Sequence, residues 1–138
     1  MKKTIFSILI LLIVSANFTN AQNKQIPNPN VAFCGATKNN DVIKYEDLLK
    51  CDEVTLPYKE LKIKSFSVSA MIPGEKAEEN SMFVDSKNEG SKLSKESLDL
   101  IKRCVQRKGT KILIENVIVI ETDGKSERKF EGISINLK

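Results

Sequence analysis

The sequence predicts a mainly β protein, built as an antiparallel β-sandwich with two short helices. Three observations support this prediction. Residues 111–138 contain two runs rich in Ile and Val on either side of Asp123-Gly124, which is a strong hairpin signal. Residues 61–72 alternate apolar and polar side chains, as a strand with one wet face does. Strands and long helices do not alternate along the chain, so a parallel βαβ sheet is not expected.

The N-terminus has the three parts of a secretory signal peptide, which we place at residues 1–21. Two lysines follow the first Met, an apolar run extends over Ile5–Ala16, and Thr19-Asn20-Ala21 supplies small residues for cleavage. An uncleaved membrane anchor is the alternative, but a spanning helix needs about 20 apolar residues and this run is shorter. We expect residues 22–30 to be a flexible leader and residues 31–138 to be the domain, exported to the periplasm or the extracellular space.

The first half of the domain contains short elements before one long strand. The candidates are a strand at Val31–Cys34, a short helix at Ile43–Lys50, a brief strand at Val54–Leu56 and a long strand at Leu61–Ile72. Asp41 is the expected cap of the short helix, because its carboxylate can accept from the first backbone N–H groups. The alternation of the long strand changes phase near Ser65, which predicts a β-bulge or bend there.

The second half contains the clearest helix and the final hairpin. The candidates are a weak strand at Ser81–Val84, a polar loop at Asp85–Lys92, a helix from Lys95 to about Gln106 and the hairpin at Lys111–Lys138. Ser94 is the expected cap of the helix, and Leu98, Ile101 and Val105 fall on one of its faces. Gly132 interrupts the last strand and predicts a second bulge. Together these short strands favour the immunoglobulin-like form of the sandwich.

The chain has three cysteines, Cys34, Cys51 and Cys104, so at least one of them stays free or pairs between chains. An exported protein can form a disulfide, and Cys34–Cys51 is the first candidate because it closes the shortest loop. The alternative is that all three are small buried apolar residues. A zinc site is not expected, since the spacings match no zinc pattern and the chain has no histidine.

Composition excludes several classes of function. The net charge is +4, and it falls to +2 without the two N-terminal lysines; basic and acidic residues are interleaved, so no nucleic-acid partner is expected. Without histidine, Ser-His-Asp and Cys-His catalysis are excluded. The acidic pairs Asp52-Glu53 and Glu78-Glu79 are typical of loops that face water, and Cys104 beside Arg103 lacks a base. We therefore expect neither an enzyme nor a site for a cofactor or a metal.

Short motifs extend over nearly the whole domain, from Phe33 to Lys138. They are Phe33-Cys34-Gly35, residues 43–49, 63–69, 93–94, 98–102, 109–112, 114–117, 123–125 and 133–135. In this order they resemble the C-terminal domain of the gliding-motility protein GldM, also called PorM, of the type IX secretion system. None of the motifs is catalytic, so the resemblance speaks mainly to the fold.

The resemblance implies an immunoglobulin-like β-sandwich in the periplasm, at the end of a dimeric rod that meets the outer-membrane ring of the secretion machine. The sequence shows neither the transmembrane helix nor the rod domains of that family, so transmission of energy from the motor is not carried over. We expect a non-enzymatic protein-binding module, accessory to or derived from the secretion and gliding machinery. Its expected partners are envelope proteins, among them secretion-ring components, or a second copy as a homodimer. The alternative is an envelope structural or small-ligand-binding protein with the same fold, which an apolar pocket would favour.

Overall fold

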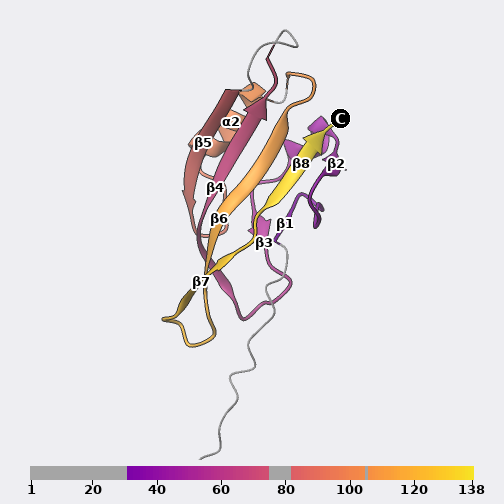
Figure 1. Cartoon of the computed structure of the whole chain (residues 1–138). Coiled ribbons are helices and arrows are strands. Elements are labelled where there is room, and N and C mark those ends of the chain that lie inside the picture. The colour runs from indigo at the N-terminus through magenta and orange to yellow at the C-terminus, as the bar shows by residue number, and fades with distance from the viewer. Residues whose placement is uncertain (1–30, 75–81, 105) are drawn as a thin grey trace, which may run out of the picture.

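The computed structural model describes residues 31–74, 82–104 and 106–138. The expected signal peptide, residues 1–21, and the expected leader, residues 22–30, lie outside these ranges. Of the described residues, 48% lie in strands and 14% in helices, so the prediction of a mainly β protein with two helices is confirmed. The strands form one six-stranded sheet and one two-stranded sheet (Figure 1).

The elements follow one another along the chain without a βαβ rhythm. In order they are β1 (Ala32–Phe33), β2 (Asp41–Ile43), α1 (Tyr45–Leu48), β3 (Val54–Thr55), β4 (Lys62–Ile72), β5 (Met82–Glu89), α2 (Lys95–Cys104), β6 (Lys111–Ile120), β7 (Glu127–Phe130) and β8 (Ile133–Leu137). The small sheet is β1-β3, and the large sheet has the order β2-β8-β6-β4-β5. Strand β7 pairs with the C-terminal half of β6.

The large sheet is mixed, because β2 pairs with β8 in parallel while its other pairs are antiparallel. The expectation of a wholly antiparallel arrangement is therefore wrong at this edge. Parallel strands need a long crossover connection, and the whole chain between β2 and β8 supplies it. Two backbone hydrogen bonds flank the pair: Asn40 N–H donates to Ser134 O at 2.8 Å, and Lys138 N–H donates to Ile43 O at 3.1 Å.

One face of the large sheet packs on the core and is called the inner face. On β4 it carries Phe66, Val68, Ala70 and Ile72, each 5% exposed or less. Helix α2 contacts β4 and β5 on this side, and the small sheet adds Phe33 and Val54 to the same core. In Figure 1 helix α2 and the small sheet lie behind the large sheet, with α2 behind β4 and β5. The inner face is thus covered by one helix and a small second sheet.

At one level of the large sheet, the alternation of buried and exposed side chains changes phase. The change occurs in β4, in β6, and between β7 and β8. The register of β4 with β6 shifts on both sides of Ser65, so the bulge or bend predicted there is confirmed. Pairing of β6 with the last strands stops after Ile114↔Ile133 and resumes at Val117↔Phe130. Each strand advances by the same number of residues across this gap, so the register does not change. Gly132 is therefore a break in pairing, and the bulge predicted there is wrong.

The expected polar loop at Asp85–Lys92 is mostly strand, because β5 continues to Glu89. The prediction failed because β5 is the edge strand of a sheet with one wet face, so almost all of its side chains are polar. Its inward position Asn88 is only 2% exposed. The Asn88 Oδ1 atom accepts the Ser94 N–H at 2.7 Å, which joins the end of β5 to the start of α2.

The two helices differ from their predictions in detail. Helix α1 is a single turn with Lys44 at its N-cap, so the expected cap by Asp41 is wrong. Asp41 instead accepts from the backbone N–H groups of Thr37 and Lys38, and these bonds lower the pKa of its carboxyl. The cap of α2 is as predicted, since Ser97 N–H donates to Ser94 Oγ at 3.1 Å.

The buried face of α2 is not the one expected from the apolar spacing. Its buried residues are Ser97, Leu100, Ile101 and Cys104. Leu98, which was expected on the buried face, is only partly buried, and the side chain of Val105 lies outside the described residues. The small side chains of Ser97 and Cys104 let the helix lie close to the sheet, and apolar spacing alone does not reveal such positions.

Candidate protein-docking surface

The second face of the large sheet is open and is called the outer face. Side chains alternate along a strand, so those between the buried residues of β4 point away from the core. The outer face consists of Phe83, Asp85, Lys87 and Glu89 on β5, Ser65, Ser67, Ser69 and Met71 on β4, Lys111, Leu113 and Glu115 on β6, Ser134 and Asn136 on β8, and Val42 on β2. No helix or strand of the described ranges covers it (Figure 1).

A column of serines on β4 forms the middle of the outer face. It consists of Ser65, Ser67 and Ser69, and charged side chains of β5 and β6 flank it. The Ser69 Oγ atom donates to Glu115 Oε2 at 3.0 Å, which fixes one of these charges against the sheet. Short hydroxyl side chains lose little conformational entropy when they are buried, and they both donate and accept hydrogen bonds. Such a face suits another protein surface better than a small ligand.

A row across one end of the outer face combines apolar and polar side chains. The strand registers align Phe83, Met71, Lys111, Asn136 and Val42 from β5 to β2. The outermost two are large apolar residues that are widely exposed, Phe83 at 66% and Val42 at 60%. Phe83 lies beside the partly exposed Met71, and Val42 is at the other end of the row, so the row has two separate apolar ends with polar side chains between them.

Among the residues that the structure describes, the outer edge of β5 pairs with no other strand. Gly90 N–H donates to Lys64 O at 2.7 Å, and this pair continues the register of Ser65↔Glu89. Antiparallel pairs alternate between hydrogen-bonded and non-bonded, so the even-numbered residues of β5 bond to β4. The odd-numbered residues Phe83, Asp85, Lys87 and Glu89 then direct their N–H and C=O groups outward. The sequence prediction missed this edge, although its charged residues alternate with a period of two.

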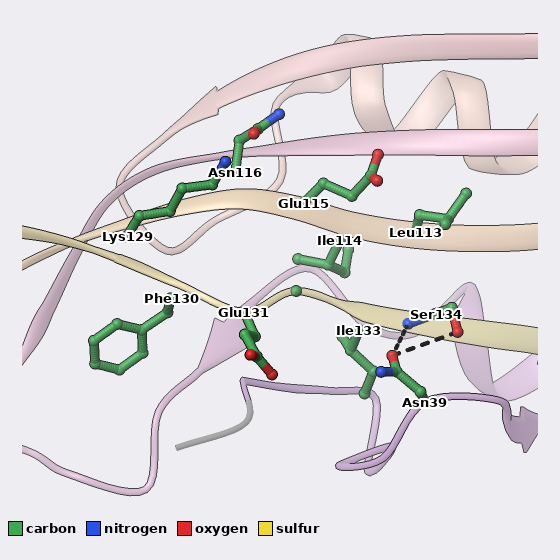
Figure 2. Close-up of a pocket in the computed structure, with 11 residues that line it drawn as sticks. Asn39, Leu113, Ile114, Glu115, Asn116, Lys129, Phe130, Glu131, Ile133 and Ser134 are labelled. Atoms are coloured by element: carbon green, nitrogen blue, oxygen red, sulfur yellow. Dashed lines mark hydrogen bonds between the residues drawn. The ribbon is translucent and has the colours of Figure 1, made fainter. Parts of the chain in front are cut away.

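A hollow of about 550 Å³ is lined by residues of β6, by the segment that joins β7 to β8, and by Asn39 (Figure 2). Of its apolar lining residues, Ile114, Phe130 and Ile133 are at most 3% exposed, and Leu113 is partly exposed. Polar side chains form the accessible rim, where Ser134 N–H donates to Asn39 Oδ1 at 2.9 Å. Small-ligand sites are usually lined mainly by apolar side chains, whereas six polar and four apolar side chains line this hollow.

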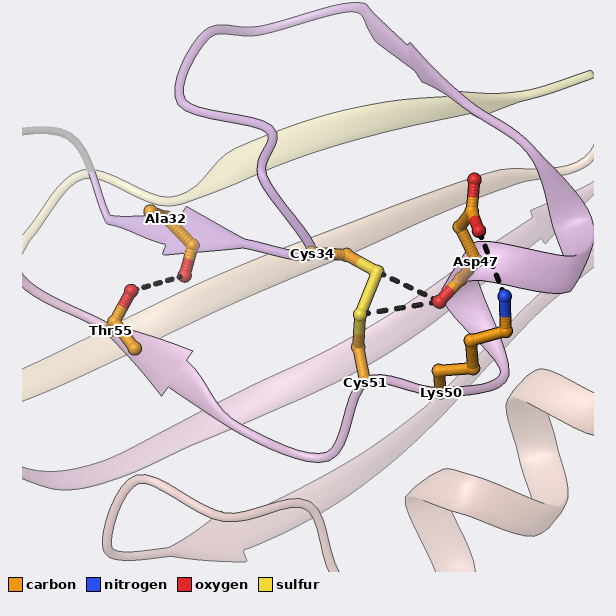
Figure 3. Close-up of a disulfide and its surroundings, with 6 residues drawn as sticks. All are labelled: Ala32, Cys34, Asp47, Lys50, Cys51 and Thr55. Atoms are coloured by element: carbon orange, nitrogen blue, oxygen red, sulfur yellow. Dashed lines mark hydrogen bonds and ion pairs between the residues drawn. A yellow bond between two sulfur atoms is a disulfide. The ribbon is translucent and has the colours of Figure 1, made fainter.

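The structure joins Cys34 and Cys51 in a disulfide, with their Cα atoms 5.6 Å apart (Figure 3). The bond ties the end of β1 to the residues after α1. Both sulfur atoms lie near the backbone carbonyl of Asp47, at 3.1 and 3.3 Å. The disulfide therefore fixes the small layer that covers part of the inner face.

The third cysteine, Cys104, is a free thiol that is 3% exposed. Burial raises its pKa, although the charges of Arg103 and Arg107 act in the opposite direction. The neighbouring Arg103 is exposed, and its Nε–H donates to the Asp99 carbonyl at 3.3 Å. The thiol is thus protonated at neutral pH and faces the core of the protein.

The acidic residues singled out in the sequence do not converge on a site. Asp52 and Glu53 are exposed, and Glu53 Oε1 accepts from Ser91 Oγ at 2.7 Å. Glu78-Glu79 lies outside the described residues. Within residues 31–74, 82–104 and 106–138, no three residues of the metal-binding types are grouped as a metal site requires.

No protein-family model matches the chain, and no curated protein shows significant similarity to it. Among the described residues, no helix is both long and apolar enough to cross a membrane.

Proposed function

We propose that this chain is a non-enzymatic protein-binding module of the cell envelope, accessory to or derived from the type IX secretion and gliding machinery. The open outer face of the large sheet is the observation that carries this proposal. It carries short hydroxyl side chains in its middle and has exposed apolar residues at its two sides, and among the described residues no further strand pairs with its β5 edge. These are features by which proteins recognise proteins.

The link to the secretion machinery rests on the resemblance to the GldM C-terminal domain. Two of its motifs, residues 63–69 and 133–135, lie on β4 and β8 of the large sheet. The immunoglobulin-like sandwich belongs to the same proposal, with β1-β3 as a reduced second sheet. Its residues Phe33 and Val54 share one core with the large sheet, which supports this assignment.

A location in the periplasm is the third part of the proposal. The expected signal peptide at residues 1–21 supports export, and a disulfide between Cys34 and Cys51 is compatible with an oxidising compartment. The proposed absence of catalysis is supported by the lack of histidine and by the burial of the one free thiol.

Affinity capture tests the proposal. The tagged chain is isolated from its native envelope after mild crosslinking, and the captured proteins are identified. We expect components of the secretion ring or the motor, and we expect Ser67→Arg to reduce their recovery about tenfold, because it places a long charged side chain in the middle of the outer face.

The matched control is Gln106→Arg, which adds the same side chain at an exposed position after α2. It should leave the recovery unchanged. The proposal is wrong if wild-type protein captures no secretion or motility component, or if both variants capture as much as wild type.

A further inference from the structure

We infer that the edge of β5 is an interface between two copies of this chain, paired antiparallel about a two-fold axis at Ser86. This inference rests on the proposed protein-binding role and names a second copy as one partner. The edge is suitable because β5 is eight residues long and ends the order of the large sheet. The other end of that order is β2, which has only three residues.

The backbone restricts how two such edges can pair. The outward N–H and C=O groups belong to the odd-numbered residues Phe83, Asp85, Lys87 and Glu89. In an antiparallel pair these residues must lie opposite one another, since only they can exchange hydrogen bonds with the second copy. A two-fold axis at any residue of the strand meets this condition, and the axes near its middle, at Asp85, Ser86 and Lys87, keep most of β5 paired.

The charges select one of these registers. With the axis at Ser86, Asp85 lies opposite the partner's Lys87, and by symmetry Lys87 lies opposite the partner's Asp85. An axis at Asp85 would place two copies of that carboxylate opposite each other, and an axis at Lys87 would oppose two lysines. Opposite charges in directly facing positions stabilise a strand pair, and like charges destabilise it.

The structure leaves these charges available for such a contact. Across the β4–β5 pair, Asp85 faces Ser69 and Lys87 faces Ser67, so β4 supplies no opposite charge to either. Both side chains are exposed. The alternating signs of Asp85, Lys87 and Glu89 also make the edge unfavourable for pairing in the wrong register, which is how natural edge strands avoid aggregation.

The pairing would join two large sheets into one continuous sheet. Because the two-fold axis is perpendicular to the sheet, both outer faces lie on the same side and the two α2 helices lie on the other. The dimer thus doubles the width of the surface proposed for docking and leaves it uncovered.

Charge exchange tests this interface. The full chain is expressed with its leader and a C-terminal tag, purified from the envelope, and its mass is measured by light scattering over a range of concentrations. We expect a dimer whose dissociation constant rises with salt. Asp85→Lys and Lys87→Asp should each raise the dissociation constant about tenfold or more, because each opposes like charges twice per dimer.

Complementation makes the test specific. An equimolar mixture of the two single variants should form a heterodimer, and the double variant D85K/K87D should recover the homodimer, since each restores opposite charges at both positions. The control K44E/E46K exchanges two exposed charges beside the other edge of the sheet and should not change the mass. Thermal unfolding of each variant shows that it is folded.

A wild-type monomer at all concentrations would overturn the inference, as would a dimer that none of the β5 variants weakens. A monomer that still captures a secretion component would contradict the inferred dimer and leave the proposed function standing. A dimer that follows the charge rules but captures no envelope partner would leave the interface standing and remove the proposed function.

Discussion

At Gly132 the chain passes so close to β6 that no side chain has room. A Cβ atom there would lie 1.9 Å from the Ile114 carbonyl oxygen, and the obstacle is backbone, which cannot turn aside as a side chain can. The opposite strand adapts at the same level, where Asn116 has a positive φ of 51°. The last two strands therefore keep one register across the break only because residue 132 is glycine.

Gly132→Ala should destabilise the protein strongly. The added methyl group must displace backbone in the middle of the sheet, at a cost of about 3 kcal/mol, the upper range for overpacking. For a domain of this size, that loss lowers the midpoint of thermal unfolding by roughly 10–20 °C.

Gly124→Asn is the control. At this position the backbone conformation favours glycine, but a side chain would have room. Gly124 has a φ of 72° and no atom near the place of a Cβ, and asparagine tolerates that region of φ. A thermal midpoint for Gly132→Ala equal to that of Gly124→Asn would contradict the close approach.

At the scale of elements, the disulfide holds together pieces that are individually too short to be stable. Strands β1 and β3 have two residues each, and α1 is one turn. Such pieces cannot form alone, since a short helix or a two-stranded sheet is marginal in water. The Cys34–Cys51 bond closes a loop with a sequence separation of 17 around α1 and limits the freedom of this segment in the unfolded chain.

The double variant C34S/C51S should lose about 3 kcal/mol of stability, the value expected for a loop of this length. Its thermal midpoint should fall, and a reductant should lower the wild-type midpoint by a similar amount. The variant itself serves as the control, because the reductant should not affect it further. A wild-type midpoint that is the same with and without reductant would refute the stabilising role of the bond.

The sequence allowed the elements with regular apolar patterns to be predicted, and it failed where burial does not follow hydrophobicity. Strands β4 and β6 were predicted because their apolar residues alternate or cluster over ten or more positions. Only the first residues of β5 were predicted, as the weak strand at Ser81–Val84, because the rest of this edge strand has a wet face and few apolar residues. The buried face of α2 was misplaced because Ser97 and Cys104, small and not strongly apolar, lie in the core.

The candidate surface was only partly visible in the sequence. The alternation of serines at 65, 67 and 69 already indicated a wet face on β4. The partners of β4 could not be read from it, since strand order depends on contacts between distant segments. The alignment of Phe83 with Val42 across the sheet, and the free edge of β5, therefore needed the structure.

The whole molecule has one closed face and one open face. The inner face is covered by α2 and the β1-β3 layer, and it supplies the stability of the domain. The outer face is free to meet other proteins, and pairing at the β5 edge would extend it across two copies. In the proposed function the binding face is thus separate from the core, so a partner would be recognised without rearrangement of the fold.

Site-specific photo-crosslinking in the native envelope tests directly whether the outer face contacts the secretion machinery. A photoreactive amino acid replaces Ser67 on the outer face or, as the control, Lys102 on the exposed side of α2. We predict that position 67 crosslinks to a secretion-ring or motor protein and that position 102 does not. No crosslink from position 67 in the folded protein, or the same products from both positions, would contradict it.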